Sequence, residues 1–164
     1  MPTPPEDCWL HPAVVTGPSD IAGTGLFAIE PIPAGTEVAR YGGHLVTVAE
    51  LTDDAASLVV GDDLHLVLPP DTDLRFANHS CDPSTGWSDG YTLATLRDLA
   101  PGDEVTHDYA TSIADPAYLL RCHCETYRCR QMVEGTDWRI PQLQRRYAGH
   151  WTPYLQGLVS AAAG

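Results

Sequence analysis

Short runs of alternating apolar and polar residues, each bounded by turn residues, predict a chain built mainly of β-strands. Turn sequences rich in Gly and Pro, such as Pro33-Ala34-Gly35 and Pro101-Gly102-Asp103, separate the runs. We expect strands over residues 13–15, 25–29, 37–41, 57–60, 64–68, 92–96 and 104–106. The fourth and fifth of these alternate around Gly61-Asp62-Asp63, which is typical of a hairpin.

Two segments are predicted to be helices. Residues 48–56 are expected as a helix that Thr47 could cap, and a second helix is expected within residues 141–147. The tail around and beyond it carries aromatic and apolar residues at helical intervals, which suit either core packing or a dimer face. The pattern therefore predicts a mostly β fold of small sheets with helical decoration towards the C-terminus.

Length and charge narrow the class of protein. The chain has 164 residues, about the size of one domain with a single core. All nine basic residues are Arg, which excludes chemistry that needs a lysine of the protein itself, such as Schiff-base formation. The net charge is −13, and residues 50–120 carry most of the acidic side chains. Such a surface repels nucleic acid and anionic membranes and favours basic partners, although a merely solvated acidic face has the same composition.

The first residues of the chain and the number of cysteines bear on the cellular compartment of the protein. The sequence has no run of 18 apolar residues, and its first residues have neither a basic start nor an apolar stretch. We therefore expect a cytoplasmic protein that does not span a membrane. Five Cys are present, an odd number, and three of them crowd into residues 122–129. That arrangement favours metal ligation over a disulfide framework.

Five motifs follow one another along the chain. They are Gly23-Thr24-Gly25-Leu26-Phe27-Ala28, Tyr41-Gly42-Gly43, Arg75-Phe76-Ala77-Asn78-His79-Ser80-Cys81, Gly102-Asp103-Glu104-Val105-Thr106-His107-Asp108-Tyr109, and Cys122-X-Cys124-X4-Cys129. Most of them are weak alone, whereas Asn-His-Ser-Cys after Arg-Phe is specific. In this order the five motifs resemble those of SET-domain lysine methyltransferases that carry a post-SET zinc module.

The resemblance implies a SET fold, in which residues 75–81 pass under the segment that ends at Tyr109 in a knot-like crossing. It divides the chain into an N-terminal arm (1–11), a SET domain (12–116), a post-SET zinc module (117–135) and a C-terminal helical tail (136–164). The activity that it implies is methyl transfer from S-adenosylmethionine to the side-chain amine of lysine in a protein or peptide. The lysine would enter through a narrow channel from the face opposite the cofactor.

Three residues would serve the reacting amine. Tyr109 resembles the catalytic tyrosine, with its hydroxyl near the transferring methyl, and Tyr41 would hold the substrate amine. His107 stands where the family usually has Phe or Tyr facing the channel. If His107 lines the channel, we expect mono- and dimethylation, and loss of activity as the pH falls through its reference pKa of about 6.5. If it turns outwards to solvent, no such effect is expected.

The resemblance also implies a cofactor site. Its residues would be Gly23, Thr24, Gly25, Arg75, Asn78, His79, Met132 and Val133. The glycines would let the backbone approach the cofactor closely. Asn78 would bind through its amide and His79 largely through its backbone, while Arg75 braces their loop. Thr24 replaces the large residue often found between the glycines, and Met132 and Val133 suit either an adenine contact or ordinary core.

A structural zinc ion takes four ligands in a tetrahedron. The resemblance assigns them to Cys81, Cys122, Cys124 and Cys129. His123 and Cys8 are possible substitutes for Cys81, and a set of free thiols is the alternative without metal. The flanking arginines, Arg121, Arg128 and Arg130, are expected to favour the thiolate forms before metal binds.

The expected partner is a basic protein or peptide that contains lysine, and neither nucleic acid nor a membrane is expected. A small amine or a biosynthetic peptide is an alternative substrate. A non-catalytic zinc-containing module that binds basic tails is an alternative of another class. Such a module does not need Tyr109 together with Asn78 and His79, so their joint presence favours an enzyme. The oligomeric state stays open.

Overall fold

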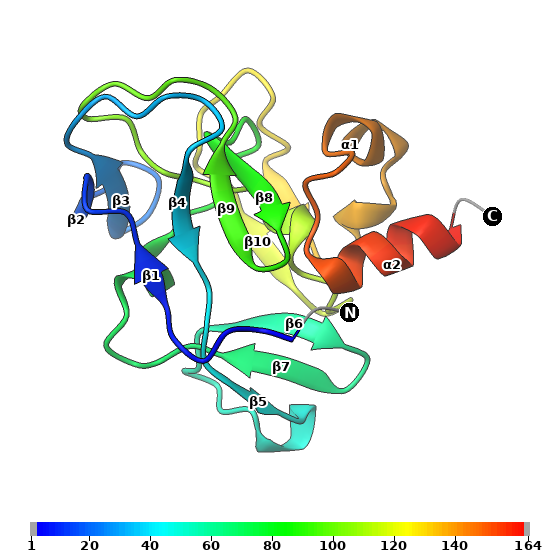
Figure 1. Cartoon of the computed structure of the whole chain (residues 1–164). Coiled ribbons are helices and arrows are strands. Elements are labelled where there is room, and N and C mark those ends of the chain that lie inside the picture. The colour runs from blue at the N-terminus through cyan, green and yellow to red at the C-terminus, as the bar shows by residue number, and fades with distance from the viewer. Residues whose placement is uncertain (1–2, 163–164) are drawn as a thin grey trace.

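Small antiparallel sheets make up most of the molecule, and helices gather towards the C-terminus (Figure 1). The computed structural model describes residues 3–162, so residues 1–2 of the expected arm and 163–164 of the expected tail lie outside the described range. Within that range the mostly β architecture with a helical C-terminal end is confirmed. No helix in the described part of the chain is both long and apolar enough to cross a lipid bilayer.

The central sheet has the strand order β1-β4-β9-β8. Its strands are β1 (Trp9–Leu10), β4 (Glu37–Arg40), β9 (Thr92–Thr95) and β8 (Thr85–Asp89). All four residues of β9 are buried, and Val38 of β4 and Leu93 of β9 are fully enclosed in the main hydrophobic core. Burial on both faces explains why β9 reads as a continuous run of small and apolar residues.

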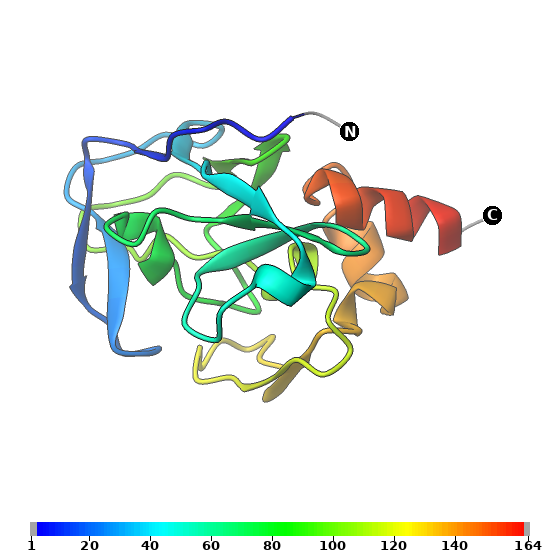
Figure 2. The same ribbon diagram turned by 90° about the horizontal axis from the view of Figure 1, so that it is seen from below.

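Two smaller sheets flank this core. One pairs β2 (Val14–Pro18) with β3 (Thr24–Ala28), and the other has the order β5 (His44–Val46), β7 (Leu64–Val67), β6 (Ser57–Gly61). The β6–β7 pair confirms the hairpin expected around Gly61-Asp62-Asp63. In both views β2 and β3 lie at the end of the molecule away from the C-terminal helices (Figures 1 and 2).

Two loop segments that are distant in sequence run side by side and connect the sheets to the C-terminal part. Residues 77–81 follow the 3₁₀ helix η2 (Asp73–Phe76), and residues 104–108 lead into the 3₁₀ helix η3 (Tyr109–Thr111). A parallel bridge joins His79 to His107, flanked by Ser80 N–H to His107 O at 3.2 Å and His107 N–H to Asn78 O at 3.3 Å. These hydrogen bonds hold the two segments against each other, as a crossing requires.

The expected strand at residues 104–106 is wrong as a regular strand. Glu104 bridges to Phe27, whereas three residues later His107 bridges to His79, so the segment changes its neighbour before a ladder can form. Besides β4, the strand that pairs with β9 is β8, which the sequence pattern did not single out.

The expected helix over residues 48–56 is also wrong, because only the 3₁₀ helix η1 (Val48–Glu50) forms. The Glu50 carboxylate folds back to accept from the Thr47 N–H at 2.9 Å and from the Thr47 hydroxyl at 2.8 Å. None of the residues of η1 is buried, so no tertiary packing stabilises further helical turns. The Thr52-Asp53-Asp54 sequence that follows favours a turn.

The C-terminal part begins with a hairpin and continues in helices. Its elements are β10 (Leu119–Arg121), β11 (Met132–Glu134), the 3₁₀ helix η4 (Asp137–Arg139), α1 (Pro141–Arg146) and α2 (Pro153–Ala162). Helix α1 confirms the expected one, and α2 is additional. The tail's apolar side chains form a separate core, Trp138, Leu143, Tyr147, Trp151 and Leu155, against Ala110. Of the two uses left open for this pattern, the structure shows core packing.

Candidate active site and metal centre

Tyr109 lies where the two crossing segments meet, and hydrogen bonds fix both ends of this residue. Its backbone N–H donates to His79 Nδ1 at 3.1 Å, and its hydroxyl donates to the carbonyl of Ala77 at 2.9 Å. Burial raises the pKa of Tyr109 well above its usual value, so the hydroxyl remains a proton donor at neutral pH. Because its proton is committed to Ala77 O, the lone pairs of the oxygen remain available to another group.

An aromatic enclosure surrounds this tyrosine. The ring centroids of His107 and Tyr109 are 5.0 Å apart, those of Trp87 and His107 5.6 Å, and those of Tyr41 and Trp87 5.2 Å. Tyr118 closes another side, with its centroid 6.5 Å from that of Tyr109. The three expected catalytic residues thus lie in one cluster, although Tyr41 directly follows β4, His107 precedes η3 and Tyr109 begins η3.

Two buried polar atoms in this cluster have no hydrogen-bond partner among residues 3–162, namely the Tyr41 hydroxyl and His107 Nδ1. An unsatisfied buried polar atom is costly and rare in folded proteins. The other ring nitrogen of His107, Nε2, lies 3.4 Å from the Ser112 hydroxyl, which is itself buried. The two side chains expected to face a substrate amine, Tyr41 and His107, can therefore each make a further hydrogen bond inside the enclosure.

The structure settles the orientation of His107 and corrects its expected titration. The residue is 5% exposed, so the alternative in which it turns outwards to solvent is wrong. Burial and, after it, the neighbouring His79 lower the pKa of His107 to about 3, although the Asp108 charge acts against them. The expected loss of activity near pH 6.5 is therefore also wrong, since the imidazole stays neutral through that range.

The expected cofactor loop packs against the Asn78 segment. Gly23 has a φ of 47°, a left-handed conformation that favours glycine, and it closes a tight turn in which Ser19 N–H donates to Gly23 O at 2.9 Å. The Asn78 amide nitrogen donates to Thr24 O at 3.1 Å and to Glu104 Oε1 at 2.8 Å. A Cβ on Gly25 would overlap the Glu104 carboxylate, so this glycine makes room for the protein's own side chain.

The remaining expected cofactor residues fall into two groups. Arg75 is exposed and donates to Pro70 O at 2.9 Å, which braces the loop before Asn78. Met132 is 40% exposed and accessible, whereas Val133 is 1% exposed. The side chain of Val133 packs with Cys81 and Cys122, so core packing accounts for it.

Four cysteine sulfurs converge beside the crossing. The sulfurs of Cys81, Cys122, Cys124 and Cys129 all lie within 4.8 Å of one another, and none of these residues forms a disulfide. The Cys81 and Cys122 sulfurs are 3.8 Å apart. Two thiolates on one tetrahedral zinc ion, each about 2.3 Å from the metal, lie about 3.8 Å apart as well. The donor set thus fits a structural zinc ion.

The flanking arginines do not have the expected general effect on the thiols. Burial raises the pKa of Cys81 to about 11, although the Arg130 N–H and its charge act against it, and burial also raises the pKa of Cys122. Burial acts to raise the pKa of Cys124 too, but hydrogen bonds, first of all with the Thr126 hydroxyl, lower it to about 6. Binding of a metal cation is what would deprotonate the two buried thiols.

His79 connects the cysteine cluster with Tyr109. Its Nδ1 accepts from the Tyr109 backbone N–H, so the neutral ring carries its proton on Nε2, which lies 3.1 Å from the Cys81 sulfur. Burial lowers the pKa of His79 to about 4 and keeps it neutral. One imidazole therefore contacts both a candidate metal ligand, Cys81, and the candidate catalytic tyrosine.

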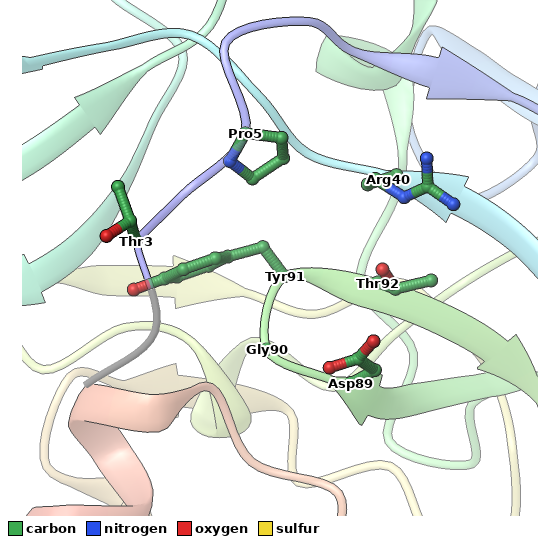
Figure 3. A pocket seen from close by; sticks show the side chains of 7 residues that line it. All are labelled: Thr3, Pro5, Arg40, Asp89, Gly90, Tyr91 and Thr92. Atoms are coloured by element: carbon green, nitrogen blue, oxygen red, sulfur yellow. The ribbon is translucent and has the colours of Figure 1, made fainter.

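Two open cavities lie away from the aromatic enclosure. One, of about 210 Å³, lies between the N-terminal arm and the β8–β9 turn, with the Tyr91 ring, Arg40 and Asp89 around it (Figure 3). The other, of about 320 Å³, lies beside the cysteine hairpin and includes His123 and Cys129. None of the expected catalytic residues lines either cavity.

Several side chains that shape the site were not expected from the sequence. Trp87 packs edge-on against His107 in the enclosure, Glu104 accepts from the Asn78 amide, and Asp108 binds Arg130. Glu104 and Asp108 lie within the Gly102–Tyr109 motif, so their place in it was a signal for both. Trp87 lies in a strand that the pattern missed, and nothing in its local sequence marked it.

Comparison with known proteins decides the family. A family model described as the SET domain matches residues 23–110, more than half of the chain. The chain belongs to the SET-domain family. The match includes the glycine loop, the Asn78 segment and Tyr109 and ends before the cysteine hairpin.

Curated relatives of this SET-domain protein include much longer chains. Histone-lysine N-methyltransferase ash1 of Drosophila melanogaster is 32% identical over 139 residues, which cover 74% of this chain and 6% of the relative. Human histone-lysine N-methyltransferase 2B is 31% identical over 134 residues, covering 70% and 5%. The chain thus spans less than a tenth of the length of these relatives. Methyltransferase flvH of Aspergillus flavus is 28% identical over 93 residues, covering 54% and 51%.

A solved structure shares the fold. It is KRYPTONITE in complex with mCHG DNA and SAH, with a TM-score of 0.53 and 23% identity, covering 67% of this chain and 26% of that one. The likeness confirms the SET fold expected from the five motifs.

Proposed function

We propose that this protein transfers a methyl group from S-adenosylmethionine to the side-chain amine of lysine in a basic protein or peptide. The observation that carries the proposal is the enclosure of Tyr109, whose oriented hydroxyl shares an aromatic cluster with the unpartnered Tyr41 hydroxyl and His107 Nδ1. Homologous histone-lysine methyltransferases support lysine as the acceptor.

Methyl transfer requires a neutral amine, whereas free lysine has a pKa of about 10.4 and is almost fully charged at pH 7. An apolar aromatic enclosure disfavours the charged form and lowers the pKa of an amine that enters it. Tyr41, Trp87 and His107 provide such walls, and His107 itself remains neutral. The enclosure therefore eases deprotonation without adding a competing positive charge.

Tyr109 would position the reacting groups. Its proton is held by Ala77 O, so its oxygen offers lone pairs to the substrate amine and to the polarised methyl group. Tyr41 and His107 offer their unused polar atoms as further partners for the amine or for a water. This arrangement aligns donor and acceptor, which is the main contribution that a site can make to an in-line displacement.

The residues present fit the methyl donor. Asn78 donates to the glycine loop and Tyr109 donates to His79, so these residues are direct neighbours beside the aromatic enclosure. S-adenosylmethionine supplies an electrophilic methyl on a sulfonium when bound there. We propose that Gly23, Thr24, Asn78 and His79 hold it, with Arg75 bracing the loop and the exposed Met132 at the edge.

The cysteine cluster would hold structural zinc through Cys81, Cys122, Cys124 and Cys129, and residues 117–135 would then act as a post-SET module. Because Cys81 belongs to the crossing and the other three ligands to the hairpin, the metal would fasten the hairpin beside the site. Reduced thiols of this kind favour a reducing compartment such as the cytoplasm.

The acidic middle of the chain favours a basic substrate. Residues 50–120 carry fourteen acidic residues and two Arg, and they include the exposed β6–β7 turn with Asp62 and Asp63. Opposite charge raises the rate of encounter with lysine-rich segments. Histone tails have this chemistry, and the similarity to histone-lysine methyltransferases supports them as candidates.

A small amine is the second candidate substrate. The observation that favours it is the relative flvH, which is named only as a methyltransferase and of which this chain covers 51%, in contrast to the long histone enzymes. The two candidates differ in size, so parallel assays with core histones and with free amino acids and small amines distinguish them. Transfer only to the small molecules would refute the protein substrate while keeping the reaction.

A calorimetric titration tests the proposed reaction class. S-adenosylmethionine and S-adenosylhomocysteine should each bind the zinc-loaded protein at one site per chain, and Asn78→Ala should weaken both. Arg139, exposed in η4 and distant in sequence from the loop, provides Arg139→Ala as a control that leaves binding unchanged. A folded, zinc-loaded protein that binds neither compound would favour the non-catalytic module.

A further inference from the structure

A buried carboxylate directly precedes the candidate catalytic tyrosine. The side chain of Asp108 is 0% exposed, and it accepts from Arg130 Nη1 at 2.7 Å and from Arg130 Nη2 at 2.8 Å. It also accepts from the Tyr147 hydroxyl at 2.9 Å and from the Ala110 backbone N–H at 3.0 Å. Four donors thus converge on one carboxylate.

These donors come from three separate parts of the chain. Ala110 belongs to η3, Arg130 follows the last cysteine of the hairpin, and Tyr147 ends α1 in the C-terminal tail. The tail makes a second contact, because Asp137 accepts from Arg130 Nε at 2.9 Å. The C-terminal helices therefore hold both the carboxylate and the guanidinium that binds it.

The Asp108 carboxylate also fixes the backbone that carries Tyr109. By accepting the Ala110 N–H it caps η3, whose first residue is Tyr109, and the Thr111 hydroxyl closes the same turn on Asp108 O at 2.6 Å. A rotation of the carboxylate would shift this turn and with it the direction of the Tyr109 hydroxyl. Burial acts to raise the pKa of Asp108, but Arg130 outweighs it and holds the pKa below its usual value.

Tyr147 completes this arrangement in a way that Arg130 alone cannot. The Arg130 guanidinium binds one edge of the carboxylate. The Tyr147 hydroxyl, which comes from the C-terminal tail, is the second donor to Oδ2. Without it, the buried Oδ2 loses one of its two donors, and the position of the carboxylate is set by fewer contacts. The ring of Tyr147 is 3% exposed, so no water can replace the hydroxyl without rearrangement.

We infer that Tyr147 of the C-terminal tail is a positioning residue for Tyr109, acting through Asp108. The tail is then part of the catalytic apparatus and more than a cover for the core. The kinetic part of this inference rests on the proposed methyl transfer, whereas the structural part does not.

The test is Tyr147→Phe, which keeps the ring and removes only the hydroxyl. The matched control is Tyr154→Phe, which removes a hydroxyl from the same tail that donates to Asp62 at 2.7 Å near the surface. Well below the melting temperature, Tyr147→Phe should lower kcat by roughly tenfold with KM for S-adenosylmethionine within about twofold. Tyr154→Phe should change neither. An unchanged kcat in Tyr147→Phe would overturn the inference.

A spectroscopic readout separates this inference from the proposed function. In protein with ¹³C-labelled tyrosine, the ring signal of Tyr109, assigned by its loss in Tyr109→Phe, should shift or broaden in Tyr147→Phe and stay in place in Tyr154→Phe. This measurement needs no turnover, so it stands even if the wild type transfers no methyl. If Tyr147→Phe does not fold, Asp137→Asn, which weakens the hold on Arg130 Nε, should give the same shift, and an unmoved Tyr109 signal there would refute the inference.

Discussion

Among the tyrosines of the enclosure, Tyr109 is the one whose hydroxyl has a hydrogen-bond partner within residues 3–162. Its proton is directed to Ala77 O, whereas the buried Tyr41 hydroxyl has no partner within residues 3–162. The difference suggests separate roles. We propose that Tyr109 is oriented before the substrate binds, and that Tyr41 takes its hydrogen-bond partner from the substrate.

Tyr109→Phe should therefore reduce turnover on the order of a hundredfold or more, because one oriented oxygen at the reacting centre is lost. Affinity for S-adenosylmethionine should remain nearly intact, since the interaction matters mainly in the transition state. Steady-state kinetics together with calorimetry measure both quantities. Tyr127→Phe, at a position 82% exposed, is the control. Near-normal turnover in Tyr109→Phe would remove this residue from the mechanism.

His107 should limit the number of methyl groups added. Its Nδ1 is buried without a partner and can hold a water in the space that a methylated amine needs, whereas Phe would leave that space free. We expect the wild type to give mono- and dimethyllysine and His107→Phe to shift products towards trimethyllysine. Mass spectrometry of the product reports the distribution. An identical distribution in both proteins would show that His107 does not set it.

Burial of neutral His107 also makes stability depend on pH. The unfolded state, with a pKa of about 6.5, binds one more proton than the native state, with a pKa of about 3, at every pH between these values. The free energy of unfolding should thus fall as the pH falls below about 6.5, by up to ~1.4 kcal/mol per pH unit from this group. Urea unfolding of His107→Phe between about pH 5.5 and pH 4.5 should show a shallower dependence by about one proton. Parallel curves for the two proteins would contradict the burial argument.

At the scale of elements, the cysteine hairpin is the part whose order should depend on metal. Three of the four clustered sulfurs lie in residues 122–129 and one in the crossing, while the main hydrophobic core contains none of them. Cys122→Ser or chelation should loosen the hairpin and weaken cofactor binding without unfolding the β core. Hydrogen exchange resolved along the chain, with Cys8→Ser as the control, checks this. Carefully prepared, unchelated protein without zinc would contradict the four-cysteine assignment.

The elements that the sequence predicted well are those with strong local signals. The alternation around Gly61-Asp62-Asp63 and the helix after Pro141 both matched the structure. The helix expected over residues 48–56 does not form beyond η1. None of the η1 side chains is buried and Glu50 folds back on Thr47, so no tertiary packing stabilises further helical turns. The segment 104–106 failed as a strand because it bridges two different neighbours. Helix α2 was missed because its stability comes from the tail's own core.

The candidate site shows the same division. Motif order was enough to place Tyr41, His107, Tyr109 and the four clustered cysteines in their neighbourhoods. The Arg130–Asp108–Tyr147 contacts could not be predicted, because they join residues 22 and 39 positions apart through side chains that no local pattern relates. The titration of His107 also depended on burial, which the sequence motif does not contain.

At the scale of the whole molecule, the absence of lysine has a direct consequence. The chain contains nine Arg and no Lys, so a lysine methyltransferase of this sequence offers no side-chain acceptor of its own. Incubation of the untagged protein with labelled S-adenosylmethionine should therefore label at most the terminal amine. Peptide mapping locates any label, and robust labelling of an internal residue would show that the chemistry is not limited to lysine.

The central claim is that the enclosure around Tyr109 methylates lysine. The most direct measurement uses two basic peptides that differ only in Lys or Arg at one position, incubated with zinc-loaded protein and isotopically labelled S-adenosylmethionine, and sequenced by tandem mass spectrometry. We expect label on the lysine side chain, no label on the arginine peptide, and strongly reduced label with Tyr109→Phe. If the protein binds the cofactor but places no methyl group on lysine in that peptide or in core histones, lysine methylation by this site is refuted.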